Sequence, residues 1–239
     1  MLAADFLSRL GDERRQQLLA LGEQRRFARN HLVFRVGEQD PLIYILLEGR
    51  VKIFQSSNAR ESILWFCAPG EVFGLAEAIR GGAREVAART TSDALIAAVP
   101  AQAFVHFVLS NEDIGRSVLE TLAARVQALR TVVMEASASD AASRVTKVLC
   151  RLARAHGQPS SCGTLVDLAI THKEISQMSG SSRQTVTSVI SDLRRRGLVR
   201  LEARRLCVVD LETLEALDGN FADDEEVAAA PPGRTADRS

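Results

Sequence analysis

Residues 171–199, THKEISQMSGSSRQTVTSVISDLRRRGLV, decide the fold of the C-terminal part of the chain. Thr171 and Glu174 have the T-x-x-E spacing of a capping box, which predicts a helix that begins directly after the threonine and stops near Gly180. Ser182 supplies a second helix start, and apolar residues then recur at helical spacing at Val186, Val189, Ile190 and Leu193. Two short helices joined by a turn that contains glycine predict a helix–turn–helix.

Polar side chains occupy the start of the second predicted helix, opposite its apolar stripe. The second helix of a helix–turn–helix enters the major groove of DNA with its N-terminal residues at the base edges. Arginine can bond guanine there, and glutamine can bond adenine. We therefore predict a base-reading face formed by Arg183, Gln184, Thr187 and Ser188. Helix N-termini and hydroxyl groups suit phosphate oxygens, and we predict phosphate contacts from Thr171, His172, Ser182 and Thr185.

Positive charge gathers in this part of a chain whose net charge is zero. Between residues 141 and 205 there are twelve Lys and Arg against four Asp and Glu, a surplus that indicates a polyanionic partner. The block Arg194–Arg196 would complement the helix dipole and contact phosphates, or it is an ordinary solvated surface. Residues 198–210 alternate like a two-stranded hairpin, the wing of a winged helix, whereas QPSSCG at 158–163 indicates a loop.

The N-terminal part has a different pattern. From about residue 24 to 100, short β-branched and aromatic runs alternate with turn residues, which predicts a β-sandwich or barrel. From residue 111 the pattern is helical. Apolar residues there recur at spacings of three and four, at Leu119, Leu122, Val126, Leu129, Val133 and Ala136. This heptad row predicts pairing with a second copy of the chain, and the alternative is a helix packed on its own domain.

Several function classes are disfavoured by what the sequence contains. The cysteines occur singly, without the C-x-x-C spacing of a metal site, and predict unpaired thiols in a reducing compartment: Cys67, Cys150, Cys162 and Cys207. The first residues do not have the pattern of a secretory signal, and we expect a cytoplasmic protein with no membrane partner. P-loop, H-E-x-x-H and G-x-S-x-G motifs are absent, so we expect no enzymatic activity.

The chain resembles the cyclic-AMP receptor protein/fumarate–nitrate regulator (CRP/FNR) family over about residues 5–215. The resemblance rests on GEQDPLIYILLEGRVKIF, PGEVFGLAEAIRGG, ASRVTKVLCRLA and the helix–turn–helix segment. It implies an α+β fold, with an N-terminal cyclic-nucleotide-binding-type β-roll (a jelly roll), a long dimerisation helix and a C-terminal winged helix–turn–helix. We accordingly expect an effector-sensing domain, a dimerisation helix, a DNA-binding domain and a disordered tail at 1–110, 111–137, 138–218 and 219–239.

The resemblance implies a homodimeric transcription regulator that binds a pseudo-palindromic operator on double-stranded DNA and recruits RNA polymerase. It places the effector pocket at Gly74, Leu75, Arg84, Glu85, Leu129 and Arg130. Cyclic-AMP-binding members have a glutamate and a serine where this chain has Leu75 and Glu85, and a Thr-Ser pair at 129–130. A carboxylate beside the phosphodiester would repel it, so we predict that cyclic AMP is not the effector. Arg84 could hold another anion or form an ion pair with Glu77 or Glu85.

Other effectors stay open at this point. The N-terminal cysteine cluster of the iron–sulfur members is absent, which argues against that cofactor. Haem-based gas sensing would need an axial ligand, for which the candidates are His31, His106 and Cys67. An apolar ligand, a cyclic dinucleotide or no effector at all are further alternatives.

The predicted reading helix also departs from the family pattern. That pattern is Arg-Glu followed by an Arg four positions after the glutamate, and it reads a TGTGA-like half-site. Arg183 is kept, whereas Gln184 and Ser188 replace the other two. We expect a retained guanine contact within a distinct half-site. The competing hypothesis is a cyclic-nucleotide-type sensor or scaffold that acts through protein contacts rather than DNA.

Overall fold

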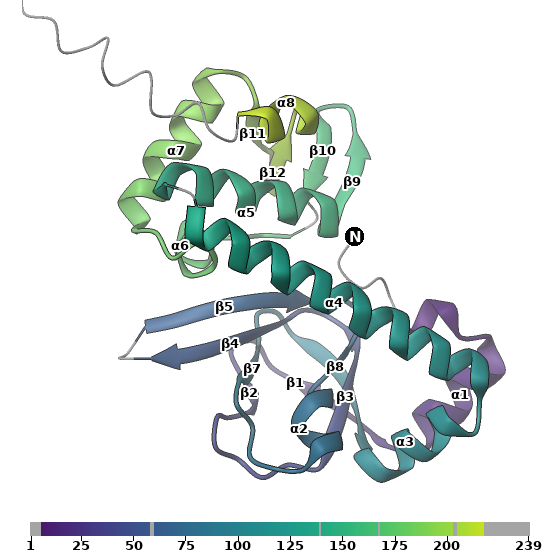
Figure 1. Cartoon of the computed structure of the whole chain (residues 1–239). Helices are drawn as coiled ribbons and strands as arrows, with labels where there is room; N and C mark the ends of the chain where they lie inside the picture. The colour runs from purple at the N-terminus through teal and green to yellow at the C-terminus, as the bar shows by residue number, and fades with distance from the viewer. Residues whose placement is uncertain (1–5, 58–59, 139, 167, 203–204, 218–239) are drawn as a thin grey trace, which may run out of the picture. The chain divides into compact units, whose positions relative to one another are not determined.

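The computed structural model describes residues 6–57, 60–138, 140–166, 168–202 and 205–217 (Figure 1). The chain forms two compact units, Met1–Met134 and Glu135–Ser239. The tail predicted to be disordered at 219–239 lies outside the described residues.

Two antiparallel four-stranded sheets form the centre of the N-terminal unit (Figure 1). One has the strand order β1-β8-β3-β6 and the other the order β2-β7-β4-β5. The strands are β1 (Glu23–Phe27), β2 (Leu32–Phe34), β3 (Leu42–Glu48), β4 (Val51–Ser57), β5 (Arg60–Cys67), β6 (Val72–Phe73), β7 (Ala87–Thr90) and β8 (Ala94–Pro100). The two sheets confirm the β-roll that the family resemblance implies, and they agree with the sandwich or barrel that the strand and turn pattern predicts.

Strand β3 shows why this part of the sequence is so continuously apolar. Tyr44 and Leu46 belong to a core that residues of both sheets form, while Ile43 and Ile45 belong to a second core with the helices. Side chains alternate between the two faces of a strand, so a strand covered on both faces needs apolar residues at every position. The helical elements of this unit are η1 (Leu7–Arg9), α1 (Asp12–Ala20), α2 (Leu75–Arg80), α3 (Ala101–Leu109) and α4 (Glu112–Ala138).

Helix α4 coincides with the helical pattern predicted from residue 111. It begins with Glu112 and Asp113, whose charges suit the N-terminal end of the helix dipole. Four residues of the heptad row are exposed on it: Leu119, Leu122, Val126 and Leu129. The side chains of Val133 and Ala136 lie outside the described part of the chain.

The C-terminal unit contains the predicted helix–turn–helix and wing (Figure 1). Its sheet has the strand order β11-β12-β10-β9, and β11 pairs with β12 as the wing hairpin. The segment expected as a loop at 158–163 instead contributes to the hairpin of β9 and β10. The elements are α5 (Ala141–His156), β9 (Gly157–Ser160), β10 (Gly163–Val166), α6 (His172–Ser179), α7 (Arg183–Arg195), β11 (Val199–Glu202), β12 (Arg205–Val208) and α8 (Leu211–Ala216).

The prediction of unpaired thiols is wrong for two of the four cysteines. Cys162 and Cys207 form a disulfide across a sequence separation of 45 residues, while Cys67 and Cys150 are free and buried. The pairing of β10 with β12 brings the two sulfurs together. Sequence spacing alone does not reveal this strand pairing. Among the described helices, none is both long and apolar enough to cross a bilayer.

Candidate nucleic-acid interface and effector pocket

Local hydrogen bonds fix the start and the end of α6. The Thr171 hydroxyl accepts from the backbone N–H of Glu174 at 3.2 Å, and the Thr171 N–H donates to the Glu174 carboxylate at 2.8 Å. This is the predicted capping box, and α6 begins at His172 as expected. Gly180 has φ of 65°, a left-handed conformation that ends the helix at little cost for glycine.

The start of α7 is fixed in the same way. The Ser182 hydroxyl accepts from the backbone N–H of Thr185 at 3.0 Å, and the two hydroxyl oxygens lie 2.8 Å apart. Ser182 and Thr185, two of the four predicted phosphate-contact residues, therefore take part in the cap of α7. The apolar stripe is buried, with an exposed fraction of at most 6% at Val186, Val189, Ile190 and Leu193. Its burial turns the opposite face of α7 outward.

The four residues of the predicted reading face are exposed on α7. Thr187 has an additional contact that the sequence does not reveal. Its hydroxyl donates to the Arg183 carbonyl at 2.9 Å and lies 3.0 Å from Nδ1 of His172. His172 and Thr187 thus join α6 to α7, and the hydroxyl of Thr187 is already engaged. We therefore expect Arg183, Gln184 and Ser188 to supply the base contacts.

The arginine block at the end of α7 is partly neutralised. Arg195 and Arg196 both form ion pairs with Asp192, the second with Nε 2.7 Å from the carboxylate. Arg194, at the same end of α7, is exposed. Asp192 precedes the two arginines by three and four residues, and this spacing in the sequence is sufficient to predict ion pairs on a helix.

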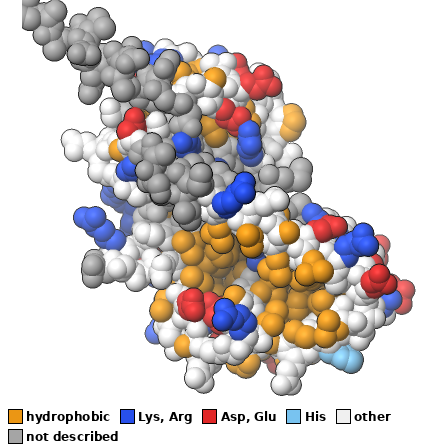
Figure 2. Space-filling view, in the orientation of Figure 1, with side chains coloured by type: hydrophobic (Ala, Val, Ile, Leu, Met, Phe, Trp, Pro, Cys, Tyr) orange, Lys and Arg blue, Asp and Glu red, His pale blue; other side chains and the backbone are white. Residues whose placement is uncertain are grey.

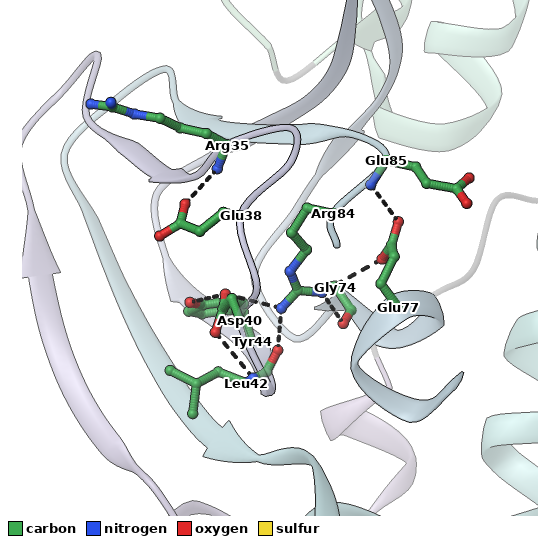
Figure 3. A network of polar contacts seen from close by, with 9 residues as sticks. All are labelled: Arg35, Glu38, Asp40, Leu42, Tyr44, Gly74, Glu77, Arg84 and Glu85. Carbon is green, nitrogen blue, oxygen red and sulfur yellow. Dashed lines mark hydrogen bonds and ion pairs between the residues drawn. The ribbon is translucent and has the colours of Figure 1, made fainter. Parts of the chain in front are cut away.

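In the N-terminal unit, Arg84 is the centre of a buried polar network (Figure 3). Its side chain is 0% exposed and its guanidinium donates to the carbonyl of Gly74 at 2.7 Å and to the carboxylate of Asp40 at 3.0 Å. It also donates to the Leu42 carbonyl and lies 3.5 Å from the Glu77 carboxylate. The expected ion pair with Glu77 is present, whereas the closer partner Asp40 was not anticipated.

Aromatic rings and a phenol complete this network. The Arg84 guanidinium lies 4.4 Å from the centre of the Phe34 ring. Tyr44 donates its hydroxyl to Asp40 at 2.7 Å. Burial and the neighbouring carboxylate of Asp40 raise the pKa of Tyr44, so this phenol stays a neutral donor. Asp40 therefore links the phenol of Tyr44 to the guanidinium of Arg84.

The remaining residues of the predicted effector pocket do not join the side-chain contacts of Arg84. Leu75 is buried in the core beside the helices. The side chain of Glu85 is exposed, and its backbone N–H donates to Glu77 at 3.2 Å (Figure 3). Leu129 and Arg130 are exposed on α4. Arg125, which is not among the predicted pocket residues, donates to the Val72 carbonyl and lies 5.7 Å from the centre of the Trp65 ring.

The three candidate haem ligands differ in their exposure to solvent. His31 and His106 are exposed, whereas Cys67 is fully buried. Burial raises the pKa of the Cys67 thiol to about 12, and a protonated thiol is a poor metal ligand. Within the described ranges, no group of three or more His, Cys, Asp or Glu side chains could hold a metal ion.

Comparisons with known proteins agree with this architecture. A family model for the cyclic nucleotide-binding domain matches residues 24–111, and one for the Crp-like helix-turn-helix domain matches residues 143–217. A CRP-like cAMP-activated global transcriptional regulator of Mycobacterium tuberculosis is 30% identical over 189 residues, which cover 79% of this chain and 84% of the relative.

Solved structures share the fold. A mutant of CooA from Carboxydothermus hydrogenoformans has a TM-score of 0.74 at 20% identity and covers 85% of this chain and 90% of its own. A CRP-family transcriptional regulator from Thermus thermophilus has a TM-score of 0.66 at 27% identity, with 82% and 96% covered.

The two units define a transcription regulator in which a cyclic-nucleotide-binding-type domain precedes a DNA-binding helix–turn–helix. The chain belongs to the CRP/FNR family. The α+β fold predicted from the sequence is confirmed, and the relatives are regulators rather than enzymes, as expected.

Replacing Asp40 tests whether Arg84 depends on it. We expect Asp40→Ala to lower the free energy of unfolding by about 3 kcal/mol, because it leaves a buried guanidinium short of its nearest counter-charge. Glu85→Ala, at an exposed neighbour of Arg84, should change it by less than about 0.5 kcal/mol. Urea unfolding followed by tryptophan fluorescence measures both, and equal stability of the two variants would contradict this assignment.

Proposed function

We propose that the chain is a homodimeric, sequence-specific regulator that binds a pseudo-palindromic DNA operator, recruits RNA polymerase in the cytoplasm and does not respond to cyclic AMP. The observation that carries the proposal is the exposed face of α7 that displays Arg183, Gln184 and Ser188 opposite a fully buried stripe. Such a face fits the major groove, where arginine and glutamine recognise purine edges in pairs of hydrogen bonds.

Exposed cations on the same unit support contacts with the phosphate backbone. Arg194 lies at the end of α7, and Arg200 and Arg205 are exposed on the wing strands β11 and β12. The pairing of Asp192 with Arg195 and Arg196 reduces the charge that the end of α7 can offer. We therefore expect Arg194 and the wing to contribute more to phosphate binding than the arginine block as a whole.

Arg183→Ala should weaken operator binding by about tenfold or more, because a bidentate arginine–guanine pair contributes about 1–3 kcal/mol. Arg154→Ala is the matched control, since Arg154 lies on α5 and forms an ion pair with Glu215. Fluorescence anisotropy at several salt concentrations measures the affinities. Binding of wild-type protein that does not weaken with salt would instead favour a scaffold that acts through protein contacts.

The half-site preference follows from Gln184. A glutamate accepts a hydrogen bond from cytosine N4, whereas a glutamine pairs with adenine N6 and N7. We propose that the chain keeps the guanine contact of Arg183 and reads a different base beside it.

Selection of binding sites from random DNA should recover a half-site other than TGTGA for the wild type. The variant Gln184→Glu should shift the selection toward a cytosine at this position. The glutamate carboxylate accepts a hydrogen bond from cytosine N4 and has no N–H to donate to adenine N7. Recovery of the unaltered TGTGA motif by the wild-type protein would refute the proposed specificity.

The homodimer is supported by an apolar row on α4. Leu119, Val126 and Leu129 have exposed fractions of 68%, 66% and 50% in the single chain. Figure 2 shows hydrophobic side chains gathered on the face of the N-terminal unit that α4 crosses. With Leu122, these residues recur at spacings of three and four, as in a coiled-coil interface, and a second copy would cover the row with the same residues.

Val126→Glu should convert the dimer to a monomer, because it places a carboxylate in the apolar row of both copies. Val36→Glu is the matched control, since Val36 is 51% exposed in a turn before β3. Sedimentation velocity separates the two states. A Val126→Glu protein that remains dimeric would place the interface elsewhere.

The absence of a cyclic-AMP response is supported by the contacts of Arg84. A ligand phosphate at this guanidinium would have to displace Asp40 and stand near Glu77. Both carboxylates are largely buried, with side-chain exposures of 10% and 13%, so their repulsion of a phosphate would be weakly screened.

Isothermal titration calorimetry should show no binding of cyclic AMP at micromolar concentrations, because Asp40 already occupies the guanidinium of Arg84. The cAMP-activated relative from Mycobacterium tuberculosis serves as the positive control under the same conditions. A micromolar dissociation constant for this chain would overturn the proposal.

A further inference from the structure

The disulfide joins two parts of the C-terminal unit that are distant in sequence. Cys162 lies in the turn between β9 and β10, and Cys207 lies in β12, at a sequence separation of 45 residues and with their Cα atoms 6.4 Å apart. The loop that this bond closes contains the whole of α6 and α7. The cross-link therefore encloses both helices of the DNA-binding motif.

Strand pairing and a close backbone approach also hold the two cysteine positions near each other. Gly163 follows Cys162, and a Cβ atom at Gly163 would lie only 2.4 Å from the carbonyl oxygen of Val208. Strand β10 pairs with β12, so that Leu165 lies opposite Cys207. The close approach requires glycine and comes from strand pairing. Reduced cysteines would stay adjacent and could rejoin without rearrangement of the fold.

A hydroxyl group lies beside both sulfurs. The Ser160 oxygen is 3.0 Å from Sγ of Cys162 and 4.0 Å from Sγ of Cys207. The same hydroxyl donates to the Gly163 carbonyl at 3.2 Å and accepts from the Cys162 N–H at 3.3 Å. In the reduced protein, rotation of its single proton from the carbonyl to Sγ of Cys162 would stabilise a thiolate, the reactive form in thiol–disulfide exchange. Cys162 is 6% exposed beside the exposed residues Ser160 and Ser161, whereas Cys207 is 0% exposed. A small reagent therefore reaches Cys162 first.

We propose that Cys162 and Cys207 form a redox-sensitive cross-link, and that a low-molecular-weight disulfide of the glutathione class oxidises the pair and thereby stabilises the DNA-binding unit. The Cys162 thiolate attacks the disulfide RSSR, forms a mixed disulfide and releases one thiolate RS⁻. The Cys207 thiolate then attacks the Cys162 sulfur, forms the protein disulfide and releases the second RS⁻. Two protein thiols are oxidised, and one RSSR is reduced to two RSH once protons are taken up.

The structural consequence lies mainly in the unfolded chain. A bond that closes a loop of this length restricts the unfolded ensemble and so favours the folded state. A regulator that acts on DNA in the proposed cytoplasmic location works in a reducing compartment. Disulfides in such compartments are usually transient and often redox-sensing, so a reversible bond fits the proposed function. This inference rests on the proposed DNA-binding function for its effect on operator occupancy, but not for its effect on stability.

Equilibration of the full-length protein with oxidised glutathione should remove two of its four thiols, as counted with a thiol reagent in denaturant. Peptide mapping without reductant should identify Cys162 linked to Cys207. The melting midpoint of the C-terminal unit should rise by roughly 10–20 °C and fall again with dithiothreitol. Operator binding should persist to a higher temperature in the oxidised protein.

Three variants separate this inference from other effects. Cys162→Ala/Cys207→Ala should lose the response of the melting midpoint to oxidation, whereas Cys150→Ala, at a buried free cysteine of the same unit, should keep it. Ser160→Ala should slow the oxidation without changing its end point. Arg183→Ala should lose operator binding and keep the redox-dependent midpoint, which distinguishes failure of the DNA-binding proposal from failure of this one.

Four titratable thiols after equilibration with oxidised glutathione would overturn the inference. A stable glutathione adduct on Cys162 in place of the internal bond would do so as well. An unchanged melting midpoint in the oxidised protein would show that the bond forms without controlling the unit, and the proposal would then be withdrawn.

Discussion

Burial of one face of α7 is the constraint on which the DNA-binding unit depends. Val186, Val189, Ile190 and Leu193 are nearly inaccessible to solvent, and burying each such side chain contributes about 1.5–3 kcal/mol. An exposed ion pair such as Arg195 with Asp192 contributes about 0–1 kcal/mol. Apolar burial therefore sets the direction in which α7 faces, and the charged and polar side chains on its other side supply contacts without deciding the orientation.

Arginine has opposite roles in the two units. Arg183 is exposed, so its guanidinium is available to a partner, whereas the side chain of Arg84 is fully buried. Transfer of a charged group out of water costs several kcal/mol, and it is tolerated when the charge is paired and hydrogen-bonded. Asp40 and the carbonyls of Gly74 and Leu42 provide this compensation for Arg84. An anionic ligand at Arg84 would have to replace the charge of Asp40. It would also have to offset the cost of leaving the Asp40 carboxylate without its ion-pair partner.

Local features of the structure were predictable from the sequence, and distant contacts were not. The caps of α6 and α7 depend on residues three apart, so T-x-x-E and the serine at position 182 were sufficient to place both helix starts. The pairs Asp40–Arg84 and Cys162–Cys207 are separated by 44 and 45 residues. They meet only because particular strands pair, and many strand orders are compatible with the same sequence pattern. The contact between His172 and Thr187 required the packing of α6 on α7.

The positions of Arg84 and of the Cys162–Cys207 disulfide bear on how such a regulator could be controlled. In the N-terminal unit, the arginine that would receive an anionic effector already forms an ion pair with Asp40 and donates to neighbouring carbonyls, so a phosphate would have to compete with these contacts. In the C-terminal unit, a covalent bond closes the loop that contains α6 and α7. A ligand stabilises a fold only by binding it better than the unfolded chain, whereas a cross-link acts on the unfolded chain directly. Control through Cys162 and Cys207 would therefore act within the DNA-binding unit itself and would need no signal from the β-roll.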